Sequence, residues 1–228
     1  MNFLNFDWQN ILMSLPGILL GLTIHEFCHA LAAFKLGDKT ARDQGRLTFN
    51  PLKHIDVFGF LFIIIAGFGW AKPVQFNPEN LKSYRRDKAI IAAAGPLSNL
   101  LLALLLMMII KFWIGMIMSA AAWDRLPFLY SDGFIYFILV VLQAAIINIG
   151  LFIFNLLPLP PLDGSHIFLS GLNLNPETEN RIMKIGAPLL FIIILIQNYS
   201  KVTILPIRPA VIFILELVIP EISLLFTL

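Results

Sequence analysis

The chain has 228 residues, of which 58% are hydrophobic and 13% are charged, and its formal net charge is +2. A soluble domain carries about a quarter charged residues, so this composition excludes a soluble protein and predicts a single membrane domain over residues 1–228. The small net charge, with its basic residues confined to loops, does not favour nucleic-acid binding, and a single cysteine excludes an internal disulfide and a cysteine-based zinc finger.

Six apolar segments follow one another with short polar connections. They are residues 11–34, 57–71, 89–118, 134–157, 182–197 and 205–228. A helix needs about 20 residues to cross the hydrocarbon of a bilayer, so we expect an all-α polytopic membrane protein with about five to six transmembrane helices. No cleavable signal peptide is evident before the first segment, which we therefore expect to be retained.

The first segment contains the sequence His25-Glu26-Phe27-Cys28-His29. A charged group in hydrocarbon costs a few kcal/mol or more, so these ionisable side chains need a compensating partner. Residues i and i+4 share one face of a helix, so the two imidazoles can bind one metal ion while the adjacent carboxylate handles a proton. A polar network without a metal has no need of this spacing. The segment therefore predicts a metalloenzyme site inside the bilayer.

The second segment, residues 57–71, is short and contains three glycines. The loops on either side each carry five basic residues, namely Lys35, Lys39, Arg42, Arg46 and Lys53, and Lys72, Lys82, Arg85, Arg86 and Lys88. A full crossing would place one of these loops outside, against the positive-inside tendency, so we expect a re-entrant hairpin. Residues 46–50 and 72–76, which flank it, alternate polar and apolar side chains, and this predicts a small β-sheet at the membrane surface.

A second polar cluster, residues 155–164, interrupts an apolar run with three prolines. Broken backbone at membrane depth is tolerated only against protein or a wet cavity. Catalytic zinc typically has three protein ligands and an open position, and Asp163 suits the third ligand. Glu216 and Glu221 are rival third ligands, and His166 is a weaker candidate for a residue that orients a ligand. With the N-terminus outside, this cluster and the two histidines meet near the cytosolic face.

The two clusters together resemble the site-2 protease family of intramembrane zinc metalloproteases. The residues that carry this resemblance are His25-Glu26-x-x-His29, Asn155-x-x-Pro158-x-Pro160-x-Leu162-Asp163-Gly164, Gly95-Pro96-Leu97-Ser98-Asn99 and Gly69-Trp70-Ala71-Lys72-Pro73-Val74. The resemblance covers residues 11–164, the three-helix core of the family. It implies that His25, His29 and Asp163 bind one Zn²⁺ per chain, that Glu26 is the catalytic acid/base, and that Asn155 contacts the substrate or the developing oxyanion. The sequence departs from larger members of the family, and we expect a compact member without a PDZ domain or a regulatory tail.

The expected function is hydrolysis of peptide bonds within or next to transmembrane helices of membrane-protein substrates. Zinc-bound water would attack the carbonyl, with Glu26 as general base. The expected partners are transmembrane substrates and the lipid bilayer but not nucleic acid, and the expected location is the plasma membrane with the active site towards the cytosol. Residues 11–164 would form the catalytic core and residues 182–228 a gate. The alternatives are a divalent-metal transporter that uses the same His/Asp site and an inactive relative that only binds membrane helices.

Overall fold

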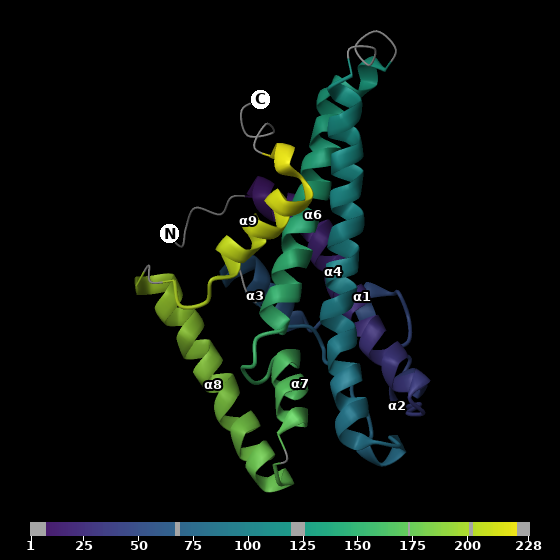
Figure 1. Ribbon diagram of the computed structural model, residues 1–228, viewed down its shortest axis with the longest axis vertical. Helices are drawn as coiled ribbons and strands as arrows, with labels where there is room; N and C mark the ends of the chain where they lie inside the picture. Colours follow the sequence, from purple (N-terminus) through teal and green to yellow (C-terminus); the bar gives the residue numbers. More distant parts are fainter. Residues whose placement is uncertain (1–7, 67–68, 120–125, 173, 201–202, 223–228) are drawn as a thin grey trace.

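The computed structural model (Figure 1) describes residues 8–66, 69–119, 126–172, 174–200 and 203–222. The helices in chain order are α1 (Trp8–Lys35), α2 (Thr40–Asp43), α3 (Val57–Ala66), α4 (Tyr84–Ile117), α6 (Asp132–Asn155), α7 (Asp163–Gly171), α8 (Pro176–Ser200) and α9 (Ile207–Val218). Three short 3-10 turns lie between them, namely η1 (Pro51–Lys53), η2 (Pro78–Asn80) and η3 (Pro127–Tyr130). The prediction of an all-α architecture is confirmed for this part of the chain.

Three helices, α1, α4 and α6, form the centre of the molecule. They have 28, 34 and 24 residues and are long and apolar enough to cross a membrane, so the chain is an integral membrane protein. All three pack against one another, and α4 and α6 run side by side along the longest axis (Figure 1). Small residues allow the close approach, because a Cβ added to Gly17 of α1 would lie 2.6 Å from the Cα of Ala144 on α6.

A hydrophobic core fills the space where α4, α6 and α9 meet. Its largest fully buried side chains are Met107, Ile110, Ile138, Ile149 and Ile219. Other large apolar side chains of α4, such as Leu101, Leu105 and Phe112, are exposed. An apolar outer surface of this kind suits contact with lipid.

Within the described ranges, fewer helices are able to span a membrane than the five to six that we expected. Among the described residues, only α1, α4 and α6 meet the length and hydropathy required. Helix α8 begins with a polar stretch that includes Glu177, Glu179, Arg181 and Lys184, and this shortens its apolar part. Helix α9 has 12 residues, about 18 Å at 1.5 Å per residue, and residues 223–228 of the last expected segment lie outside the described ranges.

The two ends of the segment that contains α3, residues 55–66 and 69–71, lie beside one another. Helix α3 has 10 residues, about 15 Å in length and half the thickness of the hydrocarbon. Ile55 and Ala71 then form an isolated antiparallel bridge, and the Lys72 amide donates to the His54 carbonyl at 2.8 Å. A Cβ added to Gly59 would lie 2.1 Å from the carbonyl oxygen of Trp70, so the two arms approach at a glycine. This segment is called the hairpin below.

The prediction of a small β-sheet at the membrane surface was wrong. No strand is present in residues 46–50 or 72–76, and the Ile55–Ala71 bridge is isolated. Side chains bind backbone groups that strand pairing would need. The Arg46 guanidinium donates to the carbonyls of Lys53 and Lys72. The fully buried His54 donates from Nε2 to the Thr48 carbonyl at 2.7 Å. Pro73, in addition, has no amide hydrogen to offer.

Asp38 ties the end of α1 to the segment before α4. Its carboxylate accepts from the Thr40 amide and hydroxyl, the Asn77 amide at 2.8 Å and the Asn80 side-chain amide at 2.7 Å. Burial alone would raise the pKa of Asp38, but these hydrogen bonds outweigh it and hold the pKa below its ordinary value. Asp38 therefore stabilises the folded chain as a carboxylate.

Candidate metal centre

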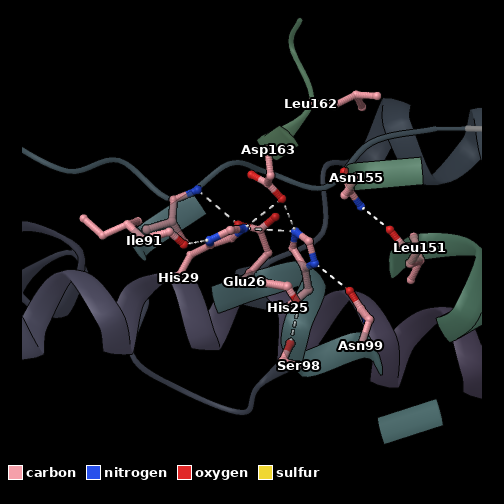
Figure 2. A network of polar contacts seen from close by, with 12 residues as sticks. His25, Glu26, His29, Ile91, Ser98, Asn99, Leu151, Asn155, Leu162 and Asp163 are labelled. Carbon is pink, nitrogen blue, oxygen red and sulfur yellow. Dashed lines mark hydrogen bonds and ion pairs between the residues drawn. The ribbon is translucent and has the colours of Figure 1, made fainter. Parts of the chain in front are cut away.

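His25 and His29 lie one turn apart on α1, as their spacing predicted, and both side chains are buried. Their Nε2 atoms are 3.0 Å apart. Asp163, the first residue of α7, faces them: its Oδ2 lies 3.1 Å from His25 Nε2 and 3.3 Å from His29 Nε2. Figure 2 shows the carboxylate of Asp163 above the two imidazole rings. Three potential ligand atoms from two distant parts of the chain thus converge on one point.

The other ring nitrogen of each histidine is already bound to an acceptor. His25 Nδ1 lies 2.6 Å from Oδ1 of Asn99, and His29 Nδ1 lies 2.7 Å from the carbonyl oxygen of Ile91. Both acceptors belong to α4. Because an oxygen of this kind can only accept from a ring N–H, each Nδ1 carries the proton and each Nε2 of a neutral ring presents a lone pair.

This arrangement fits a metal ion. Two imidazole lone pairs and a carboxylate oxygen, all about 3 Å apart, repel one another unless a positive charge lies between them, and Asp163 Oδ2 is buried without a hydrogen-bond partner. One proton could satisfy one of the three contacts, whereas one cation satisfies all three. Ligand atoms at about 2.0–2.1 Å from a tetrahedral zinc lie about 3.3 Å apart, close to the separations observed. His25, His29 and Asp163 could therefore hold a zinc ion.

Helix α4 makes room for the rings with a glycine. A Cβ added to Gly95 would lie 2.3 Å from His29 Nε2 and 2.7 Å from His25 Cε1. Gly95 and Asn99 are one turn apart and therefore share the face of α4 that meets both rings. One face of α4 thus supplies both the space and the hydrogen-bond acceptor for the predicted ligands.

Glu26 lies next to the two histidines on α1 and is also buried. Its Oε2 accepts the backbone amide of Val74 at 3.1 Å. Val74 follows the hairpin, so the arm that was expected to form a strand holds the carboxylate instead. In Figure 2 the Glu26 side chain points towards the same space as His25, His29 and Asp163.

Asn155 is the last residue of α6 and is partly buried. Its Nδ2 donates to the Leu151 carbonyl at 3.0 Å, one turn back on its own helix. Figure 2 places Asn155 beside Asp163, on the side away from Ile91. The structure thus brings this predicted residue to the edge of the site without linking it to the three ligand atoms.

The rival ligands lie elsewhere. Among the described residues, the group able to hold a metal consists of His25, His29 and Asp163. Glu216 lies on α9 and lines a surface hollow between α8 and α9 with Arg208, and Glu221 follows α9. His166 lies one turn beyond Asp163, where burial and the charge of Lys88 lower its pKa, and its Nδ1 is buried without a partner.

Four groups at the site were not predicted as part of it: Gly95, the Ile91 carbonyl, Asn99 and the Val74 amide. Two of them, Gly95 and Asn99, lie in the Gly95-Pro96-Leu97-Ser98-Asn99 motif, which is part of the family pattern given above. Val74 ends the Gly69-Trp70-Ala71-Lys72-Pro73-Val74 motif of the same pattern. The Ile91 carbonyl has no signal in the sequence, because every residue carries a carbonyl.

The chain was compared with known proteins. The model of "Peptidase family M50" matches residues 13–136 and 130–196. The Bacillus subtilis protein named "Putative zinc metalloprotease YwhC" is 44% identical over 150 residues, which cover 66% of this chain and 64% of the relative. The Mycolicibacterium smegmatis protein named "Putative zinc metalloprotease Rip2" is 32% identical over 177 residues, which cover 75% of this chain and 61% of the relative.

A more distant relative is the Methanocaldococcus jannaschii protein named "Putative zinc metalloprotease MJ0611". It is 29% identical over 175 residues, which cover 72% of each chain. The chain spans less than two thirds of the length of YwhC and of the Mycolicibacterium smegmatis Rip2. No solved structure matches the chain with significance.

Proposed function

The chain belongs to peptidase family M50, the site-2 protease family, and we propose that it is an intramembrane zinc metalloprotease that cleaves peptide bonds within or next to transmembrane helices. The observation that carries the proposal is the convergence of His25 Nε2, His29 Nε2 and Asp163 Oδ2 on one buried point. Two of these ligands lie on α1, a helix able to span the membrane. The names of the relatives support zinc as the metal.

The three ligand side chains are of the types that bind Zn²⁺ in catalytic sites. Two neutral imidazoles and one carboxylate bind Zn²⁺ as three protein ligands and leave a fourth position open, the pattern of catalytic rather than structural zinc. When bound there, zinc would supply a Lewis acid that polarises the scissile carbonyl and makes water acidic enough to attack at neutral pH. The carboxylate of Asp163 also offsets part of the ion's charge in a medium of low dielectric constant.

Glu26 is the proton carrier in this proposal. As the general base it takes the proton of the attacking water, and as the general acid it returns a proton to the leaving amine. The hydrogen bond from the Val74 amide to Oε2 at 3.1 Å orients the carboxylate and leaves Oε1 for the water. This bond also couples the position of Glu26 to the arm that leaves the hairpin.

Asn155 is proposed to bind the substrate backbone. One of its two Nδ2 hydrogens is donated to the Leu151 carbonyl, and the second can be donated to a carbonyl oxygen of the substrate or to the oxyanion that develops from it. The position of Asn155 at the end of α6, beside Asp163 in Figure 2, supports this role.

The orientation in the membrane follows from charge. Asp38 joins the end of α1 that holds Lys35 to the segment before α4, so the two strongly basic loops lie at one end of the molecule. The positive-inside tendency then places this end in the cytosol, most simply in a plasma membrane, with the hairpin as a re-entrant element. Residues 182–228 are proposed to gate the entry of transmembrane substrates, and one zinc ion is proposed per chain.

The test compares cleavage and metal binding in one preparation. The purified chain is incubated with single-span membrane proteins, with and without a zinc chelator, and zinc content is measured on the same sample. We expect cleavage that stops with the chelator and resumes with added zinc. Glu26→Gln should lose at least about 100-fold in rate while it keeps its zinc, because Glu26 is not a ligand. Glu177→Gln, at an exposed carboxylate, is the matched control and should cleave normally.

The same preparation distinguishes the transporter alternative. In sealed vesicles a transporter would move divalent metal across the bilayer, and Glu26→Gln could retain this flux. A wild-type chain that binds no zinc, or that cleaves equally well with the chelator, would refute the proposed protease.

A further inference from the structure

Two buried asparagines form a chain of hydrogen bonds that ends on a proposed zinc ligand. Asn99 of α4 and Asn148 of α6 are both fully buried. Asn99 Oδ1 lies 2.6 Å from His25 Nδ1, and Asn99 Nδ2 lies 2.8 Å from Asn148 Oδ1. The path therefore runs from α6 through α4 to α1 and joins the three central helices. Figure 2 shows its last link, between Asn99 and His25.

The direction of each hydrogen bond in this path is determined. Asn148 Nδ2 donates to the Ala144 carbonyl at 2.8 Å, so its Oδ1 must face Asn99 as an acceptor. Asn99 Nδ2 then donates both to this oxygen and to the Gly21 carbonyl at 3.1 Å. Rotating the Asn99 amide by half a turn would direct its oxygen at two other oxygens, so Oδ1 can only face His25.

The helices are shaped to hold this path. A Cβ added to Gly21 would lie 2.7 Å from Asn148 Oδ1, so a larger residue on α1 would displace the amide. Glycine at this position also exposes the carbonyl that Asn99 binds. In a segment surrounded by hydrocarbon, an unpaired amide would be costly, and every N–H of Asn99 has an acceptor.

The consequence for His25 concerns its tautomer. A neutral imidazole can carry its proton on either nitrogen, and only the form protonated at Nδ1 presents a lone pair at Nε2. An acceptor held against Nδ1 favours this form before any metal arrives and also fixes the plane of the ring. His29 obtains the same effect from a backbone carbonyl, that of Ile91, which no substitution removes.

We propose that Asn99 and Asn148 are positioning residues that hold His25 in the metal-binding tautomer, and that they thereby set the affinity of the site for zinc. This inference rests on the zinc site of the proposed function. Asn99 acts directly on His25, whereas Asn148 acts only through Asn99. If the two residues served helix packing alone, the experiment below would give a different result.

The test measures zinc affinity of the full chain in detergent by competition with a chelator. Asn99→Leu keeps the approximate size but removes the acceptor, and we expect zinc affinity to fall by about 10–100-fold, the usual cost of losing a group that orients a ligand. Asn99→Asp keeps an acceptor for His25 Nδ1 but loses the Nδ2 donor to Asn148 and Gly21, so its zinc affinity should fall less than that of Asn99→Leu. If packing were the only role, Asn99→Leu would bind zinc as the wild type does, or both variants would lose zinc equally, and either result overturns the proposal.

A double-mutant cycle tests the role of Asn148. We expect Asn148→Leu to weaken zinc binding less than Asn99→Leu does, and the double variant to be no weaker than Asn99→Leu alone, because the two residues act in series. Additive losses would contradict this order. Gln143→Leu is the matched control: it removes a hydrogen bond between α6 and Ser14 of α1 at 3.0 Å that does not reach His25, and zinc affinity should not change.

A measurement on the unsubstituted protein keeps the proposal falsifiable if a variant fails to fold. Nitrogen NMR of the zinc-free chain with labelled histidine, with the His25 signals assigned by comparison with His25→Gln, reports which ring nitrogen is protonated. We expect Nδ1–H, and Nε2–H would overturn the inference. If the wild type bound no zinc the proposed function would fail first, whereas a zinc-binding wild type with an unaffected Asn99→Leu would refute this inference alone.

Discussion

Replacing Gly95 with alanine is the sharpest test of how the metal site is built. The added Cβ would lie 2.3 Å from His29 Nε2 and 2.7 Å from His25 Cε1. Real Cβ contacts essentially never fall below 3.0 Å, so the His29 ring would have to retreat by about 0.7 Å. Metal-ligand distances tolerate changes of about 0.2 Å, so a retreat of this size breaks the bond.

A shift of α4 would not remove this steric clash without weakening the site. Moving α4 away instead would lengthen the hydrogen bonds from His25 to Asn99 and from His29 to the Ile91 carbonyl, now 2.6 and 2.7 Å. Both routes weaken the ligand set, so we expect Gly95→Ala to lower zinc affinity by at least about 100-fold, the upper end of the range for losing a supporting group. Cleavage should fall with it.

The assay is chelator competition on the purified chain in detergent, with helix content measured by circular dichroism. Gly115→Ala is the matched control because it makes the same change in the same helix, where the new Cβ has nothing within 4 Å. This control should bind zinc normally and remain at least as helical, since alanine favours a helix over glycine by about 1 kcal/mol. If Gly95→Ala bound zinc within about threefold of this control, the ligand geometry described above would be wrong.

Two other parts of the structure give predictions about stability. Asp38→Asn should destabilise the chain by about 2 kcal/mol near neutral pH, because hydrogen bonds to a charged group contribute about 1.5–3 kcal/mol each. Since folding lowers the pKa of Asp38, this stabilisation is complete above the unfolded value of about 3.9 and is lost as the pH falls below it. The difference in thermal unfolding between the two proteins should therefore be largest at pH 7 and become smaller as the pH falls below about 3.9. A difference that does not change with pH would contradict the role of the charge. Lys88→Met should loosen α8, because it leaves Glu179 of α8 without its buried partner on α4. Limited proteolysis before α8 should become faster, the double variant Lys88→Met with Glu179→Met should restore protection, and an unchanged rate in the single variant would contradict the contact.

The sequence determined those features that depend on local periodicity. A spacing of four residues places His25 and His29 on one face of any helix, and their Nε2 atoms lie 3.0 Å apart in the structure. The prolines between Asn155 and Asp163 required the chain to leave the helix, so the partner ligand begins a new one, α7. Three of the long apolar segments are helices able to span a membrane. A long apolar segment predicts this result because backbone groups in hydrocarbon must bind one another, and a helix satisfies all of them within one segment.

Features that depend on competition between distant groups were decided only by the tertiary structure. Residues 46–50 and 72–76 have the alternation of strands, yet Arg46, His54 and Glu26 bind the backbone groups around them and no ladder forms. The groups that accept hydrogen bonds from the two histidines are also distant in the sequence: Ile91 lies 62 positions after His29, and Asn99 lies 74 positions after His25. The spacing of residues shows which side chains share one face of a helix. It does not show which other helix packs against that face, because this depends on whether all the buried polar groups find hydrogen-bond partners away from water.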